Sequence, residues 1–174
     1  MNQIYTHPKR KTKVVFVQLG SPSEPTTKAL RKYLRKFLGD PRVIDINPWL
    51  WKIILNFFVL PFRPKKSAKL YARIWDGKSF PLITNTRDFT KNVGEELKKI
   101  DPNGHVEVNY AFLLSPPYVN EVYDSWENDL KKGIGATKLL VIPMFPQYSE
   151  STIASGIDAL AKELSKRVKI PTFE

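Results

Sequence analysis

The chain has 174 residues, 42% of them hydrophobic, which predicts a single globular domain with a sizeable core. It contains no cysteine, which excludes disulfides, thiolate metal sites and a cysteine nucleophile. Lys and Arg outnumber Asp and Glu by 28 to 17, and the net charge of +11 favours an anionic partner such as lipid headgroups or a carboxylated or phosphorylated ligand. We expect no nucleic-acid partner, because no recognised motif is present and the cations lie on several separate segments. The N-terminus has no apolar core of the kind found in secretory signals, so a cytoplasmic location is expected.

The first part of the chain has the pattern of a parallel α/β sheet. Residues 1–12 are expected to form a flexible basic tail, and residues 13–174 a single lobe. An apolar, β-branched run predicts a strand over residues 13–19. Apolar residues at helical spacing predict an amphipathic helix over residues 26–38, and a short second strand is predicted over residues 43–46. Strand, helix and strand in this order are typical of a parallel sheet.

Residues 48–60 form the most apolar stretch of the chain, and they are too few to span a bilayer as a helix. Two interpretations are open: a buried core helix, or a partly exposed apolar lip that meets a hydrophobic ligand, a membrane surface or a partner. Two tryptophans, Trp49 and Trp51, and the pair Phe57 and Phe58 favour the lip.

Cations follow the apolar stretch directly. Arg63 and Lys66 beside an apolar lip would suit an amphipathic ligand whose carboxylates pair with these side chains. An exposed basic turn explains the same residues equally well.

The rest of the chain continues the alternation of helices and strands. We expect helices over residues 67–75, 86–100, 118–132 and 151–168, strands over residues 105–112 and 138–143, and the beginning of a further strand at residue 168. The predicted fold is therefore α/β, a four-stranded, mostly parallel sheet with helices on both faces.

Two loops with unusual polar content follow predicted strands, over residues 18–22 and 146–152. Both would open on the carboxyl edge of the sheet, where ligands bind in open α/β folds. Tyr148 and Ser149 lie on the second loop, just before a helix N-terminus, which attracts anions. The alternative is a simple helix cap, with Ser149 or Ser151 as the N-cap residue.

The residues give little support for catalysis. Neither of the two histidines has a carboxylate at motif spacing, and no H-x-x-x-H, phosphate-binding loop, dinucleotide fingerprint or nucleophile elbow is present. The pattern favours binding, with no catalytic residue and no metal site predicted.

Four collinear motifs resemble the N-terminal half of ferrochelatase, the enzyme that inserts ferrous iron into protoporphyrin IX. They are VQLGSP at residues 17–22, YLRKFLGDPRV at 33–43, RPKKSA through Tyr71 to Trp75 at 63–75, and PQYSEST at 146–152. Together they span nearly the whole chain.

The resemblance implies a tetrapyrrole ligand, haem or protoporphyrin IX, and a single chelatase-like lobe. Leu19 matches a residue on the metal side of the macrocycle, residues 49–60 match a hydrophobic mouth that in some members meets the membrane, and Arg63 and Lys66 match cations near the propionates. The ligand-contacting positions that it implies are Leu19, Trp49, Trp51, Phe57, Phe58, Arg63, Lys66, Tyr110, Tyr148 and Ser149.

The departures from the family are equally informative. Ferrochelatases run to roughly twice this length as two similar lobes, and their catalytic histidine, in an S-x-H motif, and its acidic partner lie in the second lobe, which has no counterpart in these residues. Three hypotheses follow: a homodimer that binds a tetrapyrrole without inserting metal, one subunit of a split ferrochelatase, or a degenerate interaction domain. Tyr148, Tyr110, His105 and His7 are the candidate axial ligands if the bound tetrapyrrole carries iron.

Overall fold

The computed structural model describes residues 11–133, 135–167, 170 and 172–173. Within them the chain forms a parallel sheet of three long strands and one very short one, in the order β2-β1-β3-β4. The strands are β1 Thr12–Gln18, β2 Val106–Phe112, β3 Lys138–Pro143 and β4 Thr172–Phe173. Of the expected basic tail, residues 1–10 lie outside the described residues, and Thr12 already belongs to β1.

Six α-helices and three shorter helical segments connect these strands in the described part of the chain. The α-helices are α1 Thr27–Leu38, α2 Pro48–Ile54, α3 Arg63–Tyr71, α4 Pro81–Ile100, α5 Val119–Lys131 and α6 Ser155–Leu164. The segments η1 Leu55–Val59 and η3 Glu150–Ala154 are π-helical, and η2 Ala72–Ile74 is a 3₁₀ turn.

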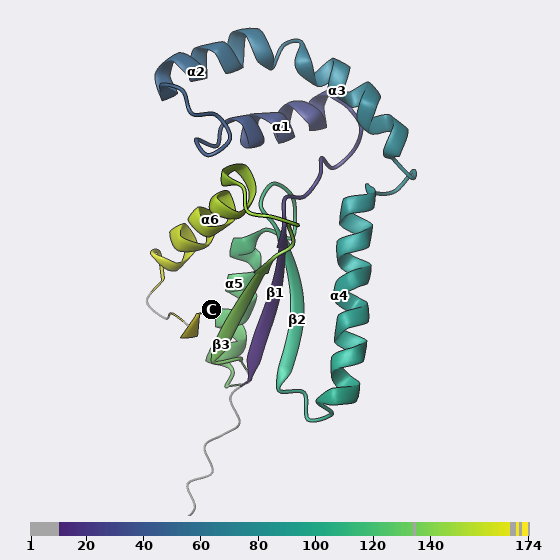
Figure 1. Ribbon diagram of the computed structural model, residues 1–174, viewed down its shortest axis with the longest axis vertical. Helices are drawn as coiled ribbons and strands as arrows, with labels where there is room; N and C mark the ends of the chain where they lie inside the picture. Colours follow the sequence, from purple (N-terminus) through teal and green to yellow (C-terminus); the bar gives the residue numbers. More distant parts are fainter. Residues whose placement is uncertain (1–10, 134, 168–169, 171, 174) are drawn as a thin grey trace, which may run out of the picture.

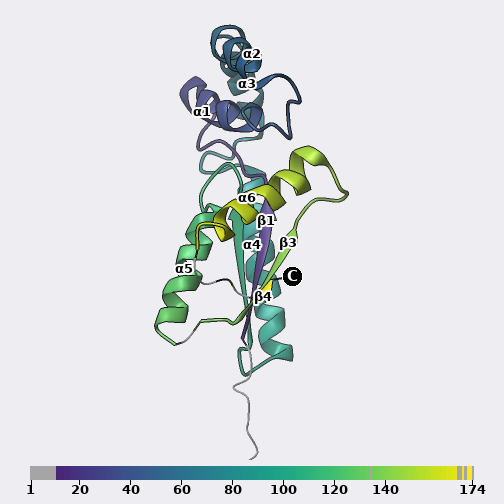
Figure 2. The same cartoon turned by 90° about the vertical axis from the view of Figure 1, so that its left-hand side faces the viewer.

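Helices cover both faces of the sheet, as predicted: α4 lies on one face, and α5 and α6 on the other (Figures 1 and 2). From the central strand β1 the chain runs through α4 to β2 on one side, and from β2 it runs through α5 to β3 on the other side of β1. Because both crossovers are right-handed and they run in opposite directions across the sheet, α4 and α5 lie on opposite faces. Successive side chains of β1 point to opposite faces of the sheet, so β1 contributes to the core on each face. Val15 and Val17 pack with α5, whereas the ring of Phe16 lies 5.1 Å from that of Phe89 on α4.

Helices α1, α2 and α3 form a separate layer beyond the carboxyl ends of the strands (Figure 1). This helical layer, residues 27–74, has its own core of Tyr33, Leu34, Leu38, Leu55 and Leu60. Two covalent segments join it to the α/β body, residues 19–26 and 75–80.

The predicted strand over residues 43–46 is wrong. Val43 and Ile44 instead form a turn after α1, in which both backbone N–H groups donate to the carbonyl of Asp40, at 3.0 and 3.2 Å. Those donors are therefore not available to a sheet ladder. Both side chains pack against the core of the helical layer, which explains why the segment is apolar without being a strand.

The remaining differences concern element ends. Helix α4 begins at Pro81 rather than residue 86, because Pro in the first turn of a helix needs no N–H partner. Helix α3 begins at Arg63 for the same reason, with Pro64 in its first turn. The sheet has three full-length strands rather than the four predicted. The further strand expected from residue 168 falls largely outside the described residues, which lack 168, 169 and 171, and only the two-residue β4 follows them.

Candidate ligand site at the carboxyl edge of the sheet

The side chain of Gln18 joins the ends of β1 and β3. Its Nε2 donates to the carbonyl of Met144 at 2.7 Å, and its Oε1 accepts from the backbone N–H of Leu19 at 3.0 Å. The carbonyl of Leu19 then accepts from the N–H of Leu114 at 3.0 Å, which ties the loop after β1 to the loop after β2. The backbone around Leu19 is therefore held in place on both sides.

Gly20 allows the chain to turn out of the sheet at this point. Its φ of +92° is a conformation that side chains rarely adopt, and a Cβ there would collide with Oγ of Ser115. The carbonyl of Gly20 accepts from the hydroxyl of Tyr33 at 3.3 Å, and Ser21 N–H donates to Oγ of Ser115 at 3.3 Å. This packing brings α1 of the helical layer against the loop after β2.

A cleft of about 310 Å³ lies between α1, the loops after β1 and β2, and the start of α4. Its apolar wall includes Ala29, Tyr33, Trp75, Phe80, Ile83 and Leu114. Its polar groups are the hydroxyls of Ser21, Ser23, Ser79, Ser115 and Tyr118, and the ammonium groups of Lys32 and Lys36. No acidic side chain is among the described residues that line it. Apolar walls with a few hydroxyl and cationic groups suit a largely apolar ligand that carries acid groups.

Two side chains that line the cleft, Lys36 and Tyr33, are strongly influenced by their neighbours. Nζ of Lys36 donates to the hydroxyl of Tyr118 at 2.8 Å and lies 4.2 Å from the centre of its ring. Burial, followed by the effect of Tyr71, raises the pKa of the Tyr33 hydroxyl well above its usual value. Tyr33 therefore stays neutral and can serve as a hydrogen-bond donor.

Residues 48–60 are exposed on one side, so the lip rather than the buried core helix describes them. We call the exposed apolar residues of α2, η1 and the following turn the apolar lip: Trp49, Leu50, Ile53, Phe57, Phe58 and Phe62. Trp49 is 78% exposed, and Leu55 and Leu60 point into the core of the layer. Trp51 is not part of the lip surface, because it is half-buried and its Nε1 donates to the carbonyl of Leu38 at 2.7 Å.

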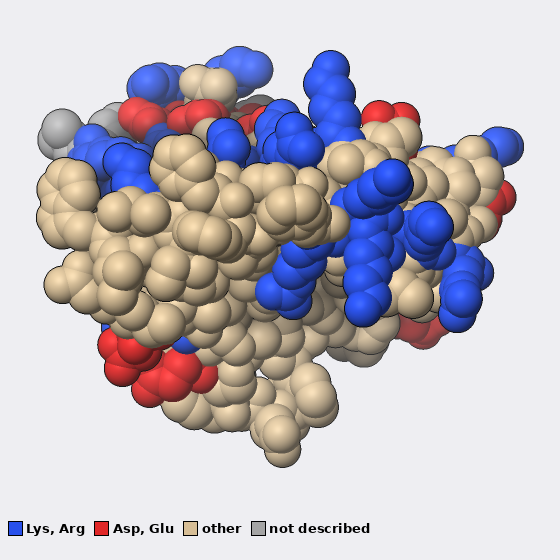
Figure 3. Space-filling view, turned by 90° about the horizontal axis from the view of Figure 1, so that it is seen from above, with Lys and Arg blue, Asp and Glu red and all other residues tan. Residues whose placement is uncertain are grey.

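The helical layer carries most of the net charge. Twelve of the 28 Lys and Arg residues but only two of the 17 acidic residues fall within residues 27–74, a net charge of +10. Figure 3 looks down on this layer, with an uncharged surface on one side and cations gathered on the other. Arg63 and Lys66 are exposed on the first turn of α3, beside the apolar lip, and neither lines the cleft.

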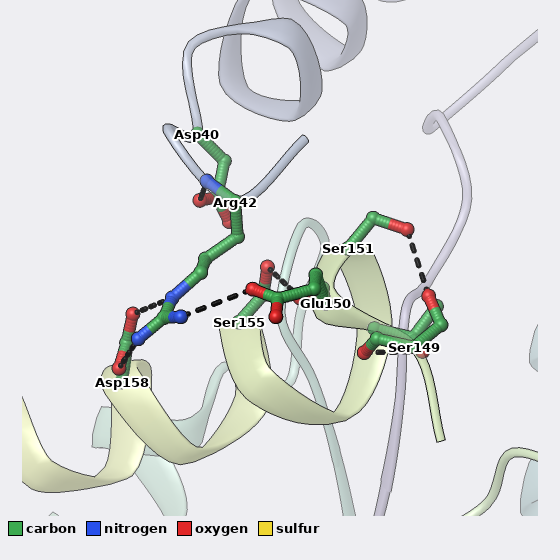
Figure 4. Close-up of polar contacts among 8 residues, drawn as sticks. Asp40, Arg42, Ser149, Glu150, Ser151, Ser155 and Asp158 are labelled. Carbon is green, nitrogen blue, oxygen red and sulfur yellow. Dashed lines mark hydrogen bonds and ion pairs between the residues drawn. The ribbon is translucent and has the colours of Figure 1, made fainter. Parts of the chain in front are cut away.

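The loop after β3 ends at the first turn of η3. Tyr148 is 63% exposed. Ser149 is the N-cap residue of η3, and its carbonyl accepts from Ile153 N–H at 3.0 Å. Its hydroxyl does not cap the helix but lies 3.0 Å from that of Ser151 (Figure 4). Capping therefore accounts for the backbone of Ser149 and leaves the side chain without a capping role.

Arg42 connects the helical layer to η3 and α6 (Figure 4). Its guanidinium donates to both carboxylate oxygens of Asp158, at 2.8 and 3.2 Å, and to Glu150 at 3.1 Å. The hydrogen bond from Arg42 lowers the pKa of Asp158, and those from Asp158 and Glu150 raise the pKa of Arg42. This clamp fixes the turn after α1 against the helix that follows Ser149.

A ferrochelatase family model matches residues 11–174, almost the whole chain. The chain belongs to the ferrochelatase family. It is 42% identical over 158 residues to a ferrochelatase of Idiomarina loihiensis, a match that covers 91% of this chain and 42% of the relative. It is 40% identical over 169 residues to the coproporphyrin III ferrochelatase of Streptococcus mutans, covering 95% of this chain and 50% of the relative. The chain therefore spans half or less of the length of these two relatives.

The residues that the ferrochelatase motifs implicate do not form one cluster. Trp49, Phe57 and Phe58 share the lip, with Arg63 and Lys66 beside them. Leu19 lies on the loop after β1 and is hydrogen-bonded to Leu114, which lines the cleft, but Leu19 itself does not line it.

Tyr110 belongs to a different part of this ferrochelatase lobe. It pairs with Phe16 in the sheet and lines a groove of about 670 Å³ along α4 and β2, together with His105. His105 precedes β2, at the amino edge of the sheet, with its Nδ1 2.8 Å from Asp101. His105 and Tyr148 therefore lie at opposite edges of the sheet and cannot be axial ligands of the same iron, and His7 lies outside the described residues.

The sequence pattern did not indicate that several side chains at the carboxyl edge belong to the candidate site. Lys32 and Lys36 looked like part of a solvated helix face, and the cleft becomes visible only when α1 is placed against the loop after β2. Arg42 stood within the ferrochelatase-like motif at residues 33–43, which was the available signal. No cluster of three or more metal-ligating side chains occurs in the described part of the chain.

Proposed function

We propose that this chain is a ferrochelatase-type lobe that binds a tetrapyrrole, haem or protoporphyrin IX, in the cleft at the carboxyl edge. The observation that carries the proposal is the cleft itself, with apolar walls, hydroxyl groups and two cations but no acidic side chain among its described lining residues. Its position beneath a layer of charge +10 would attract a ligand with ionised propionates.

The size of the cleft supports a shared site. Pockets for drug-sized ligands run from about 300 to 1,000 Å³, and this cleft of about 310 Å³ would enclose only part of a macrocycle. The rest of the ligand would require a second surface. We propose that a second copy of the chain supplies it, with the apolar lips of the two copies covering each other.

The positive charge of the helical layer should make the formation of this homodimer depend on salt. Two helical layers that each carry +10 repel one another, so pairing should be weak at low salt and stronger when salt or an anionic ligand screens the repulsion. A dimer that forms around a dianionic tetrapyrrole satisfies this condition.

We propose that the lobe alone binds the tetrapyrrole without inserting metal. Metal insertion needs a base that takes the pyrrole protons, and the described residues that line the cleft include no histidine and no carboxylate. The relatives' greater length supports one alternative: in a split ferrochelatase, a second polypeptide would bring the base.

The apolar lip also supports contact with a membrane surface. Among the described residues no helix is both long and apolar enough to cross a bilayer. Exposed Trp and Phe side chains beside Lys and Arg are typical of segments that lie in the interface of anionic lipids. We propose peripheral contact through the lip when it is not covered by a second copy.

Absorbance titrations with haem and with protoporphyrin IX test the binding proposal. We expect a saturable shift of the main porphyrin band at half a ligand per chain, accompanied by dimerisation in light scattering. One ligand per chain on a monomer would support binding but contradict the shared site. No shift with either ligand would overturn the proposal and favour a lobe with a purely interaction role.

A further inference from the structure

We propose that the outer edge of strand β2 is a self-association surface, to which a second copy of the chain adds its own β2 in antiparallel orientation. The surface belongs to the α/β body and lies outside the helical layer, the apolar lip and the cleft. The inference therefore goes beyond the proposed tetrapyrrole site and does not rest on it.

Strand β2 is the outermost strand on its side of the sheet, and β1 is its only neighbour among the described strands. It is seven residues long, as long as the central β1. Helix α4 lies along one face of β2, and within the described residues no strand continues the sheet beyond it (Figure 1). The edge of a long outer strand presents backbone N–H and C=O groups that can pair with another chain.

Hydrogen bonds at the two ends of β2 show which of its residues face β1. At the start, Thr12 N–H donates to the carbonyl of His105 at 2.7 Å, and at the end Leu113 N–H donates to the carbonyl of Gln18 at 3.1 Å. Backbone groups point alternately to the two sides of a strand in a parallel ladder. The odd-numbered residues between these ends therefore bond to β1, and the even-numbered residues direct their N–H and C=O groups away from the sheet.

The outward groups of β2 are covered at both ends and open in the middle. The N–H of Val106 donates to Oδ2 of Asp101 at 3.1 Å, and the N–H of Phe112 donates at 2.8 Å to a carbonyl of the loop that follows β2. Between them, the N–H and C=O groups of Val108 and Tyr110 and the carbonyl of Val106 have no hydrogen-bond partner in the part of the chain that the structure describes. The free edge is therefore a short window, residues 106–110.

This window is centred on Val108 and is complementary to itself. When Val108 of one copy lies opposite Val108 of a second copy, the two residues exchange both of their N–H···O=C hydrogen bonds. The N–H of Tyr110 then meets the carbonyl of Val106 of the second copy, which is free because only the N–H of Val106 is used by Asp101. A two-fold axis through the middle of the window thus satisfies the same groups on both chains.

The side chains on the α4 face agree with this register. Val108 and Tyr110 point to that face, because they pair in the sheet with Val14 and Phe16, and Phe16 packs against α4. Val108 would lie beside its counterpart, and Tyr110 beside Val106 of the second copy. Pairs of β-branched residues, and of an aromatic with a β-branched residue, stabilise neighbouring strands.

The opposite face of β2 agrees as well. In the same register Glu107 of one copy lies opposite Asn109 of the other, so no two like charges stand directly opposite. Within one chain, Nδ2 of Asn109 donates to Oε1 of Glu107 at 2.7 Å. An amide nitrogen carries two hydrogens, and the second can be donated to Glu107 of the second copy.

There is room for a second strand beside β2. A groove of about 670 Å³ follows α4 and β2 along this edge. Gly94 allows α4 to approach β2 closely, since a Cβ there would lie 3.0 Å from Cγ2 of Val108. The α4 side chains that line the groove carry both signs of charge, among them Arg87, Lys91 and Glu95.

Charge distinguishes this interface from pairing through the lips. Outside residues 27–74 the chain carries 16 Lys and Arg against 15 acidic residues, so the body is nearly neutral. Two bodies that pair through β2 should therefore repel one another little, and salt should change the pairing only slightly. Pairing through the lips, by contrast, should strengthen with salt.

Sedimentation equilibrium of the ligand-free protein at several concentrations, at low and at physiological salt, tests the proposal. We expect a monomer–dimer equilibrium at high protein concentration that changes by less than about three-fold with salt. F57S/F58S, which alters only the lip, should dimerise as the unaltered protein does.

Val108→Pro is the matching change in the window. It removes an N–H that points away from the sheet, and proline is tolerated on edge strands at such positions. Each copy loses one intermolecular hydrogen bond, so we expect dimerisation to weaken by about ten-fold or more. Circular dichroism melts establish that the variant is folded.

Cross-linking tests the same interface without disturbing the centre of the window. Because the chain has no cysteine, a single cysteine reports one position. In the proposed register the two copies of residue 109 are diagonal neighbours, about 7–8 Å apart. Asn109→Cys should give a covalent dimer with a short bismaleimide, and Lys162→Cys, exposed on α6, should not.

Three results would overturn the proposal: a ligand-free protein that is monomeric at every concentration, a folded Val108→Pro variant that dimerises normally, or equal cross-linking at residues 109 and 162. Loss of the ligand-free dimer in F57S/F58S would assign self-association to the lips instead. If Val108→Pro does not fold, the cross-linking result decides. Porphyrin titrations at low protein concentration test the tetrapyrrole site separately from all of these.

Discussion

Charge and exposure separate the helical layer from the α/β body. Residues 27–74 carry twelve Lys and Arg against two acidic residues, whereas the remaining residues carry 16 against 15. The body buries Trp126 and Phe112, whereas the layer places Trp49 and the other lip residues outside. The body is therefore built as a self-contained scaffold, while the layer presents a surface that only a ligand, a membrane or another chain can cover.

The two tryptophans give the largest contrast. Trp126 is 2% exposed, and its Nε1 donates to the carbonyl of Ala136 at 2.7 Å, so Trp126→Ala should lower the free energy of unfolding by about 3–5 kcal/mol. Trp49→Ala removes a side chain that is 78% exposed and should change it by less than about 0.5 kcal/mol. Urea unfolding of both variants measures the difference, and equal losses would show that the lip is part of the folded core.

The two connections between layer and body should differ in their tolerance of a side chain. Gly20 and Gly77 have φ values of +92° and +94°, but a Cβ would collide with Ser115 only at Gly20. Gly77→Ala should lower the free energy of unfolding by about 1 kcal/mol because of its backbone conformation alone. Gly20→Ala should lower it by clearly more, because the added Cβ also collides with Ser115. Chemical denaturation of the two variants provides the comparison, which would fail if Gly77→Ala were the more damaging.

The lip should control binding to lipid vesicles. F57S/F58S removes two apolar side chains that are 68% and 67% exposed. It should lower the affinity for anionic vesicles, measured by co-sedimentation, by about ten-fold or more, because each Phe that becomes buried in the membrane contributes about 1.5–3 kcal/mol. Phe89→Ser is the control, because Phe89 is 43% exposed but lies on α4 of the body. Vesicle binding that both variants retain would contradict a membrane role for the lip.

The Arg42 clamp should give the smallest effect, because its groups are solvated. The pKa of Asp158 is lowered from 3.8 in the folded state, so the clamp stabilises the fold above that value and the contribution is lost as pH falls through the folded pKa. Arg42→Gln should therefore lower the urea midpoint slightly at pH 7, and the difference from the unaltered protein should start to shrink as pH falls below about 4. A difference that does not shrink as the pH is lowered further would assign another role to Arg42.

The sequence predicted the elements whose pattern is local. The apolar run at Lys138–Pro143 is a strand with the predicted bounds, and the spacing of Leu30, Leu34 and Leu38 gave the buried face of α1. Val43 and Ile44 misled the prediction, because apolar residues packed under a helical layer look the same as a short strand.

The candidate site was less predictable because it depends on contacts between distant segments. The aromatic content of residues 48–60 indicated the exposed lip correctly. The cleft combines α1, Ser79 and Tyr118, which come together only through the loops after β1 and β2. Neither the spacing of Lys32 and Lys36 nor their neighbours in the chain distinguishes them from the other cations of α1.

Ring-current shifts in an NMR titration would test the central claim most directly. Protoporphyrin IX is added to ¹⁵N-labelled protein, and the backbone signals that move show which surface faces the macrocycle. We predict the largest shifts at Ser21, Tyr33 and Ser115 around the cleft and at Phe57 and Phe58 on the lip. Shifts confined to the groove of Tyr110 and His105 along α4 and β2 would contradict a tetrapyrrole site at the carboxyl edge.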